Sequence, residues 1–354
     1  MKRVPPKKLK PLVEAIFAAA GCSAPEPERI AHYLVESNLV GHDSHGVIRV
    51  MTYVNWLREG KVLANQRLTV VFENESLAVV DGHFGFGQTI GEAAVKIGID
   101  KAARQGVSAI ALRNCGHLGR IGDWPTLAAE AGLVSLHFVN TSGLGILMSP
   151  FGGIDRRLSA NPIAAGVPVP GGWPMILDMS TSSIAEGKIR VAFNKGVQVP
   201  DDCLIDSVGR PTTDPKVFYG DPPGAILPFG GHKGYGLGMI TEVLAGALTG
   251  GGCSTPGVTR LSNGMLSIYL DPRRFAADDE FHADVRRFVD WVKSSRPNKP
   301  GGEILAPGEV EQRCHAQRSR EGIELDDTTW GQIVATAQSV GIGPEQVAMI
   351  VAEG

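Results

Sequence analysis

The stretch GFGQTIG at residues 85–91 decides which kind of α/β fold the sequence favours. It follows an apolar, β-branched segment at 68–80, interpreted as a strand, and opens a helical pattern over 88–104. A glycine-rich turn in that context can mark a dinucleotide-binding Rossmann unit. Here the spacing is GxGxxxG, and Arg113-Asn114 follow the next strand in place of an acidic residue that could bind a ribose hydroxyl. We therefore interpret the stretch as an ordinary turn and helix start.

Around this stretch the hydrophobic pattern predicts helices, then a mixed β-rich segment, then helices again. Residues 8–60 have the pattern of three helices, the second near 25–39. Beyond the glycine-rich stretch, strands are expected at 107–112 and 134–139, with a helix near 122–131 between them.

The residue composition changes between about 140 and 232, where glycine and proline dominate. The elements expected here and beyond are strands at 163–167, 175–177 and 265–270, helices at 182–193 and 235–248, and amphipathic helices from 279 to the end. Residues 194–231 form a long Gly/Pro-rich excursion, and a loop of that length inside a compact domain is usually functional or packed on a partner.

The composition provides ample material for a hydrophobic core. The chain has 354 residues, of which 43% are hydrophobic and 20% are charged, so two domains, or one domain with a large excursion, are expected. Its formal net charge of −3, without a basic stripe or a long run of charge, argues against nucleic-acid binding and against a disordered tail.

The cysteines and the N-terminus indicate the compartment. There are five cysteines, an odd number, at wide spacing and without a CxxC pair, which favours reduced thiols in the cytoplasm over disulfides or a zinc ribbon. AAAGC at 18–22 resembles a lipoprotein cleavage site, but Glu14 interrupts the apolar region and Leu12 and Ile16 recur at helical spacing, so we predict an amphipathic first helix. No segment reaches the ~20 apolar residues of a membrane span.

The densest polar cluster is GHDSHGVIR at residues 41–49. His45 and Arg49 are four apart and would share one face of a helix. A 2-oxo acid needs such a pair, because Arg can clamp a carboxylate and His can protonate the carbonyl oxygen as hydride reaches carbon. Ser44 or Asp43 could orient the imidazole. The alternative interpretation of this cluster is a solvated loop. His42 and His45 could also suggest a metal site, but no third ligand lies at a suitable spacing, so no metal is expected.

Three further clusters could take part in binding or catalysis. RNCGHLGR at 113–120 lies just after a predicted strand, where ligand sites collect, so His117 could be a second acid or base, or a capping or core histidine. The hydroxyls of DMSTS at 178–182 could cap the helix that follows or mark a phosphate site at its start. PFGGHKGYG at 228–236 places His and Lys at the mouth of an apolar helix expected to be buried, where a phosphate or a nicotinamide amide could bind.

Taken together, the blocks are specific. GHDSHG, RNCGHLGR, NPIA, LDMSTSSIAEGKIR, PFGGHKGYG and LAPGE, in this order and at these separations, make the sequence resemble the malate/L-lactate dehydrogenase family that lacks a Rossmann fold. The resemblance covers essentially the whole chain and is nearest to the bacterial hydroxycarboxylate dehydrogenase branch. Other members are ureidoglycolate dehydrogenase, diketogulonate reductase and piperideine-carboxylate reductase. The resemblance to this family implies NAD- or NADP-dependent interconversion of a small 2-hydroxy carboxylate and a 2-oxo carboxylate.

The resemblance also implies roles for individual residues. His45 looks like the proton donor, Ser44 like its relay partner and His117 like a second active-site histidine, while Arg49 looks like the carboxylate clamp and Asn161 like a substrate-binding residue. The residues expected to contact the cofactor are His45, Gly119, Arg120, Ile121, Thr141, Ile176, Leu177, Asp178, Met179, Ser180, His232, Lys233, Asn263, Gly308, Glu309, Val310 and Glu311.

The implied α/β (α+β) fold has a central, mixed but largely antiparallel sheet packed on a helical domain made from both chain ends. We expect the helical domain at 1–75 plus 272–354 and the cofactor-binding β-rich domain at 76–271. The resemblance further implies a homodimer with the site near the subunit interface.

Two departures from the family pattern bear on specificity. Cys115-Gly116 stands where relatives often have polar or aromatic residues, which leaves the shape of the substrate pocket open. Ser180-Thr181-Ser182 replaces the commoner Ala-Thr-Ser, and no nearby Arg serves a 2′-phosphate, so NAD is favoured over NADP. Reduction of a cyclic imino acid is the alternative activity, and a cofactor-binding protein without catalysis is the alternative class.

Overall fold

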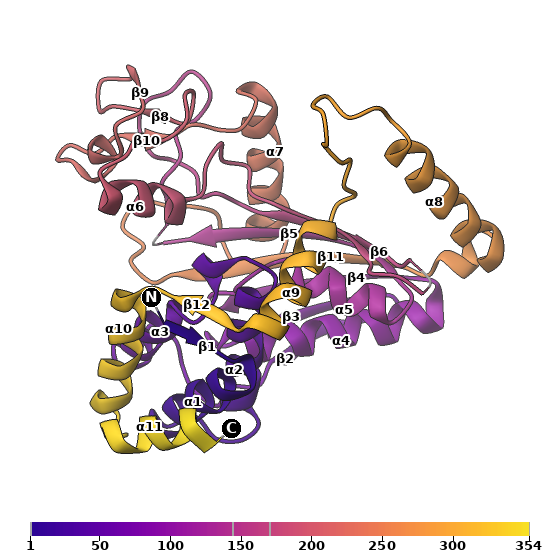
Figure 1. Ribbon diagram of the computed structural model, residues 1–354. Helices are drawn as coiled ribbons and strands as arrows, with labels where there is room; N and C mark the ends of the chain where they lie inside the picture. The colour runs from indigo at the N-terminus through magenta and orange to yellow at the C-terminus, as the bar shows by residue number, and fades with distance from the viewer. Residues whose placement is uncertain (1, 144, 170, 354) are drawn as a thin grey trace.

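A seven-stranded mixed sheet forms the centre of the protein in the computed structural model, which describes residues 2–143, 145–169 and 171–353 (Figure 1). The strand order is β2-β3-β4-β11-β5-β6-β7, and every neighbouring pair is antiparallel except β3 and β4. The strands are β2 (Thr69–Glu73), β3 (Leu77–Asp81), β4 (Val107–Cys115), β5 (Val134–Ser142), β6 (Ile163–Val167), β7 (Met175–Met179) and β11 (Ser262–Leu270). The expected largely antiparallel sheet is confirmed.

Helices cover both faces of this sheet (Figure 1). α4 (Gly87–Gln105) and α5 (Asp123–Glu130) pack on one face, where they share an apolar core with the sheet that includes Trp124 and Tyr269. α7 (His232–Glu242), with the π-helical segment Val243–Ala247 that continues it, packs on the other face against β5 and β11.

The GFGQTIG stretch makes the turn between β3 and α4, and its glycines serve packing. A Cβ on Gly87 would lie 2.1 Å from the carbonyl oxygen of His117 and 2.6 Å from Cα of Leu118. The chain at 117–118 therefore occupies the start of α4, where a Rossmann unit would hold a phosphate. The interpretation as an ordinary turn and helix start agrees with this packing.

A helical layer built from both ends of the chain packs beside the sheet (Figure 1). Its core joins residues 4–62 to residues 323–347, and Phe86 reaches into it from the start of α4. The short strands β1 (Lys2–Val4) and β12 (Ile323–Leu325), which the sequence did not reveal, pair antiparallel and tie the two ends together. The helices are α1 (Pro6–Ala19), α2 (Glu26–Leu39), α3 (Arg49–Arg58), α9 (Glu309–Glu321), α10 (Asp327–Ser339) and α11 (Pro344–Glu353).

The Gly/Pro-rich excursion is itself folded. α6 (Glu186–Lys195) and the three-stranded sheet of β8 (Leu204–Ile205), β9 (Pro211–Thr212) and β10 (Ala225–Ile226) enclose a third apolar cluster around Ile189 and Phe218. The division into domains at 75/76 and 271/272 stays a prediction. What supports it is that the helical core and the sheet core draw on different parts of the chain.

Three expectations from the sequence were wrong in detail. Residues 68–80 form a hairpin rather than one strand, because Asn74 accepts hydrogen bonds from the N–H groups of Ser76 and Leu77 and so makes a turn. The hydroxyls at 180–182 do not cap a helix: α6 begins only at Glu186, and these side chains bond one another and nearby carbonyls.

The third expectation that was wrong in detail concerns α7, which was expected to be buried. One side of it packs on the sheet, but the other is exposed and apolar, and Ile240 and Val243 lie on that side with 57% and 48% of their surface accessible. The helix α8 (Asp278–Lys293) is also unlike the others, because it projects from the rest of the molecule (Figure 1) and leaves Trp291 70% exposed.

Two glycines in helices test how tightly the sheet core is packed. A Cβ on Gly98, in α4, would lie 2.1 Å from a ring carbon of the fully buried Tyr269, whereas a Cβ on Gly331, in α10, would meet nothing within 4 Å. We expect G98A to lower the free energy of unfolding by about 1–3 kcal/mol through overpacking. The matched change G331A should raise it by about 0.5–1 kcal/mol. Chemical denaturation measures the free energy of unfolding of both variants. Equal changes in G98A and G331A would contradict the tight packing of Gly98 against Tyr269.

Candidate active site

The polar cluster at 41–49 forms a fixed turn between α2 and α3. Asp43–His45 is a single 3₁₀ turn, held by Asn38 at the end of α2, whose side-chain oxygen accepts from the N–H of Val47 at 2.8 Å. Gly46 must pass against Asn38, because a Cβ there would lie 2.2 Å from the Asn38 Oδ1 atom. The turn therefore has little freedom to move.

His45 and Arg49 come together, but not for the reason that their spacing suggested. His45 precedes α3 rather than sharing a helix with Arg49, the first residue of α3. The Arg49 Nε–H donates to the backbone carbonyl oxygen of Ser44 at 2.6 Å, which draws the guanidinium back over the turn. Among the described residues, no hydrogen bond or ion pair engages its two terminal nitrogens, so they can bind a ligand.

Ser44 rather than Asp43 orients the imidazole of His45. The Ser44 hydroxyl lies 3.0 Å from His45 Nδ1. Asp43 instead receives hydrogen bonds from Asn38 and from Arg318 in α9, at 2.6 Å from each. With Nδ1 engaged by the hydroxyl, the Nε2 atom of His45 is the one that remains for a substrate.

The second predicted histidine stacks beside the first. The rings of His45 and His117 are nearly parallel, at 10°, with centroids 5.7 Å apart. His117 lies just beyond β4, and its Nδ1 is 2.7 Å from the hydroxyl of Tyr53, which in turn accepts from Gln88 Nε2 at 3.2 Å. The sequence analysis missed Tyr53 and Gln88, although Tyr53 follows Arg49 by four residues and so lies on the same face of α3.

Burial and a neighbouring cation keep both histidines neutral. Burial, and then the charge of Arg49, hold the pKa of His45 well below its usual value of 6.5, and the same two causes lower the pKa of His117 to about 3. At neutral pH each ring can therefore accept a proton, and an anionic ligand that offsets the charge of Arg49 would make protonation easier.

Asn161 lies just before β6 and is bonded to α7. Its side chain is fully buried, and its amide nitrogen donates to the Oε2 atom of Glu242 at 2.5 Å and to the carbonyl oxygen of Gly238 at 3.3 Å. Beside it, Asn263 accepts from the N–H of Leu118 at 2.9 Å and donates to the Thr141 hydroxyl at 2.9 Å. Asn161 and Asn263 thus bond protein atoms on all sides and shape the pocket from behind.

The residues expected to contact a cofactor fall into two groups. Asp178, at the end of β7, accepts from the N–H of Gly122 at 2.7 Å, and the N–H of Ile176 donates to Pro307 at 3.2 Å. These contacts bring the segments 119–121, 176–180 and 308–311 together. The Oε1 atom of Glu311 lies 3.3 Å from Nε2 of His42, which joins this group to the turn that holds His45.

The second group is the start of α7. Gly230 and Gly231 have φ angles of 55° and 61°, followed by the exposed side chains of His232 and Lys233. The N–H of Phe229 bonds the carbonyl of Thr181 at 3.1 Å, so this glycine-rich turn lies beside the segment at 176–180. The roles of all these residues stay predictions.

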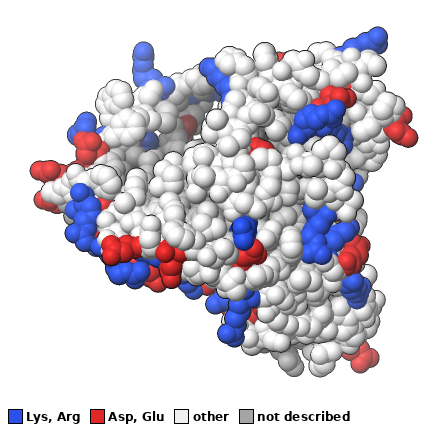
Figure 2. Space-filling model, turned by 180° about the vertical axis from the view of Figure 1, so that it is seen from behind, with Lys and Arg blue, Asp and Glu red and all other residues white. Residues whose placement is uncertain are grey.

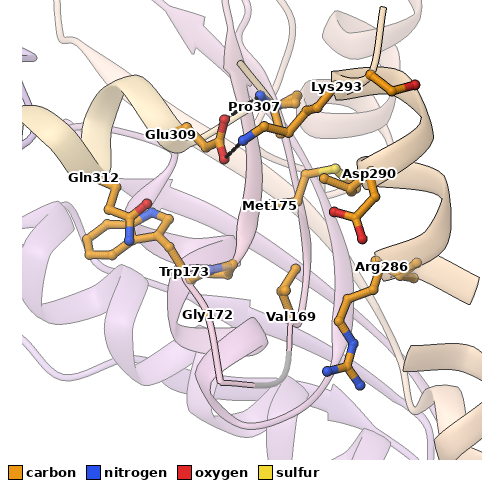
Figure 3. Close-up of a pocket in the computed structure, with 15 residues that line it drawn as sticks. Val169, Gly172, Trp173, Met175, Arg286, Asp290, Lys293, Pro307, Glu309 and Gln312 are labelled. Carbon is orange, nitrogen blue, oxygen red and sulfur yellow. Dashed lines mark hydrogen bonds and ion pairs between the residues drawn. The ribbon is translucent and has the colours of Figure 1, made fainter. Parts of the chain in front are cut away.

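A cavity of about 540 Å³ opens between α8 and the start of α9 (Figure 3). The ring of Trp173 and the side chain of Met175 line one side, and Lys293 of α8 reaches across to pair with Glu309. The cavity therefore borders the 308–311 segment with an apolar wall and a charged rim.

Comparison with known proteins now decides the family. The profile of the malate/L-lactate dehydrogenase family matches residues 4–334. The chain belongs to this family. Hydroxycarboxylate dehydrogenase B of Escherichia coli K12 is 39% identical over 343 residues, which cover 96% of this chain and 94% of that one.

Solved structures of the malate/L-lactate dehydrogenase family superpose over nearly the full length. An E. coli protein assigned as a malate/lactate dehydrogenase gives a TM-score of 0.95 at 36% identity, covering 100% of this chain and 99% of that one. The Δ1-piperideine-2-carboxylate reductase of Pseudomonas syringae gives 0.85 at 30% identity, covering 95% and 100%. Both the family and the fold that the sequence blocks suggested are confirmed.

Proposed function

We propose that the protein transfers a hydride between a nicotinamide cofactor and a small 2-oxo or 2-hydroxy carboxylate. The observation that carries the proposal is one site: a free guanidinium end on Arg49 beside two neutral, stacked histidines. The membership of the malate/L-lactate dehydrogenase family supports the same chemistry. The cofactor would supply the hydride, and the chain supplies binding, orientation and the proton.

Arg49 would hold the substrate carboxylate. Its Nε is fixed on the Ser44 carbonyl, so the two terminal nitrogens present a planar fork that matches a carboxylate. His45, steered by the Ser44 hydroxyl, would give its Nε2 proton to the carbonyl oxygen during reduction and take it back during oxidation. His117, fixed by Tyr53, closes the opposite side of the pocket with Asn161 behind it.

The residues present fit a dinucleotide. Two successive positive-φ glycines, Gly230 and Gly231, precede His232 and Lys233 at the start of α7, and the exposed Lys233 ammonium beside this turn suits a diphosphate. In addition, the Nε of the buried Arg120 has no hydrogen-bond partner, so a polar group is lacking beside the 119–121 turn.

We assign NAD rather than NADP as the preferred cofactor. Two of the cationic groups near the cofactor segments are already paired: Arg120 with Asp123 at 2.7 Å, and Lys293 with Glu309. A 2′-phosphate would have to compete with these carboxylates, whereas a ribose hydroxyl could donate to one of them. Initial rates with NADH and NADPH at equal concentration test this assignment, and a higher kcat/KM with NADPH would overturn it.

The lowered pKa of His45 sets the pH dependence. Because its folded pKa lies below 6.5, the neutral base needed for oxidation is already present across the neutral range, so kcat/KM for the hydroxy acid should stay level as pH falls from 8 to 6.5. Reduction needs the protonated form, so kcat/KM for the oxo acid should keep rising as pH falls through that range. A reduction profile that levels off above pH 7 would contradict the assignment.

Reduction of a cyclic imino acid is the second candidate, because the P. syringae relative of similar fold is a Δ1-piperideine-2-carboxylate reductase. Arg49 would clamp the carboxylate of either substrate, and the two activities differ only in the C=O or C=N acceptor. Parallel assays with pyruvate and with a cyclic imino acid separate them, since turnover of the imino acid alone would favour this candidate.

We further propose a homodimer built on the exposed side of α7. Met239, Ile240 and Val243 form an apolar ridge there, with 41%, 57% and 48% of their surface exposed. Few charged side chains interrupt the middle of the molecular face that Figure 2 shows. Such exposed ridges are typical of protein interfaces.

An aspartate in this ridge should disrupt the dimer. We expect I240D to sediment at half the mass of the wild type, because the carboxylate would be buried without a partner in the interface. M349D, on the exposed side of α11, changes a residue of similar exposure elsewhere and should leave the mass unchanged. A wild-type monomer, or a dimeric I240D, would contradict this interface.

The cytoplasm is the proposed location. All five cysteines carry free thiols, as expected for a reducing compartment. Among the described residues, no helix has the length and apolar character to cross a membrane.

A further inference from the structure

Glu242, the last residue of α7, is a buried carboxylate held by neutral donors alone. Only 5% of its surface is exposed, and it forms no ion pair with another described residue. It accepts from Asn161 Nδ2 at 2.5 Å, from the N–H of Ser254 at 2.6 Å and from Asn140 Nδ2 at 3.1 Å. Burying a charge is costly, and these three bonds are what compensate for it.

The first of these bonds fixes Asn161 against α7. The other hydrogen of the Asn161 amide bonds the carbonyl of Gly238, one turn earlier in the same helix, and its oxygen accepts from the N–H of Thr141 at 3.4 Å. The backbone of Asn161 has φ 28°, which a non-glycine residue adopts only when its surroundings hold it there. Glu242 supplies the shortest of the bonds that do so.

The bond between Glu242 and Asn140 leads toward the histidine pair. Asn140 accepts from the Asn263 amide at its backbone oxygen, at 2.9 Å, and Asn263 accepts from the N–H of Leu118, also at 2.9 Å. Leu118 directly follows His117 in the chain. A continuous run of hydrogen bonds therefore joins Glu242 to the backbone that presents His117.

The surroundings leave this network little room to adjust. A Cβ on Gly264 would lie 2.0 Å from the Ala245 carbonyl oxygen, and one on Gly246 would lie 2.7 Å from Asn140 Nδ2. The helix also widens into its π-helical segment immediately after Glu242, a feature often found at functional sites. A displacement of the Glu242 carboxylate would therefore also shift the side chains of Asn161 and Asn140.

We propose that Glu242 is a positioning residue for the reaction, whose carboxylate sets Asn161 and, through Asn140 and Asn263, the loop of His117. This inference rests on the proposed function, because it concerns the geometry of the same site. Glu242 touches neither substrate nor cofactor in this account and acts only through these side chains.

The substitution E242Q tests the proposal with little change in volume. The new amide keeps one acceptor but turns an N–H toward one of three groups that are themselves donors, so one bond is lost. We expect kcat for oxo-acid reduction to fall by about 10- to 100-fold. The KM for the oxo acid should change less than kcat, since the Arg49 clamp lies outside this network.

A buried carboxylate elsewhere provides the matched control. Glu26 is 3% exposed and accepts from the N–H of Asn65, in the helical layer away from the site. E26Q should alter the melting temperature but leave kcat per folded molecule at the wild-type value.

The outcomes separate the two levels of the account. A kcat for E242Q within about twofold of the wild type, or a loss no larger than that of E26Q, would overturn the positioning role. Should E242Q not fold, E242D keeps the charge but shortens its reach, and a kcat unchanged in E242D would overturn it equally. If the wild type reduced no oxo acid or imine, the proposed function would fail. The positioning claim would then stand or fall on the His117 imidazole resonance, which E242Q should shift and E26Q should not.

Discussion

The variant H45A should lose about 10²–10⁴-fold in kcat for oxo-acid reduction, the range expected when a general acid is removed. The loss follows from the geometry: Ser44 holds Nδ1 of His45, which leaves Nε2 to deliver the proton beside the Arg49 fork. Binding of NADH, followed by fluorescence, should persist, because the predicted contacts of the diphosphate and adenosine lie elsewhere.

Two further variants make this result specific. H32A removes an exposed histidine of α2 whose ring packs against Tyr33, and it should retain wild-type kcat. H117A should impair the reaction less than H45A, since His117 shapes the pocket in this account. Near-normal turnover by H45A together with an inactive H117A would reverse the two roles.

Removal of the Arg49 guanidinium should be the other large effect. We expect R49A to lose about 10²-fold in kcat/KM for a 2-oxo acid, corresponding to a charge-assisted hydrogen bond of roughly 3 kcal/mol. R49K should recover only part of this, because an ammonium is a point charge and cannot match both carboxylate oxygens. Steady-state kinetics against pyruvate measure both variants.

The substrate itself provides the control for Arg49. With a carbonyl substrate that lacks the carboxylate, the wild type and R49A should differ little, since the guanidinium then has nothing to bind. R58A, at the other end of α3, removes an exposed arginine bonded to Ser339 and should leave kcat/KM unchanged. An equal loss on both kinds of substrate would show that Arg49 acts on the fold rather than on the carboxylate.

Much of this site could be predicted from local sequence. The clusters around His45 and His117 contain polar residues that neither capping nor packing required, and the order of the blocks identified the family. The missing acidic residue after 107–112 was enough to set the Rossmann fold aside. The structure adds that His117 and Leu118 fill the space at Gly87.

What could not be predicted depends on contacts between distant segments. Tyr53 and Glu242 matter through side chains that meet His117 and Asn161 only after folding, and Gln88 acts through Tyr53. Only Tyr53 has a local signal, its spacing of four residues from Arg49. The pairing of β1 with β12 joins the two chain ends and is equally non-local. For α7, a uniformly apolar sequence could not distinguish a buried helix from one whose outer side awaits a partner.

The most direct test of the central claim is the oxidation of NADH and NADPH, followed by absorbance, against pyruvate, oxaloacetate, hydroxyphenylpyruvate and a cyclic imino acid. The account predicts turnover of at least one 2-oxo acid, faster with NADH than with NADPH, and a kcat/KM that is about 10²-fold lower in R49A. Binding of NADH without turnover of any compound in the panel would contradict it, and would mean that the chain shares the family's fold but not the proposed reaction.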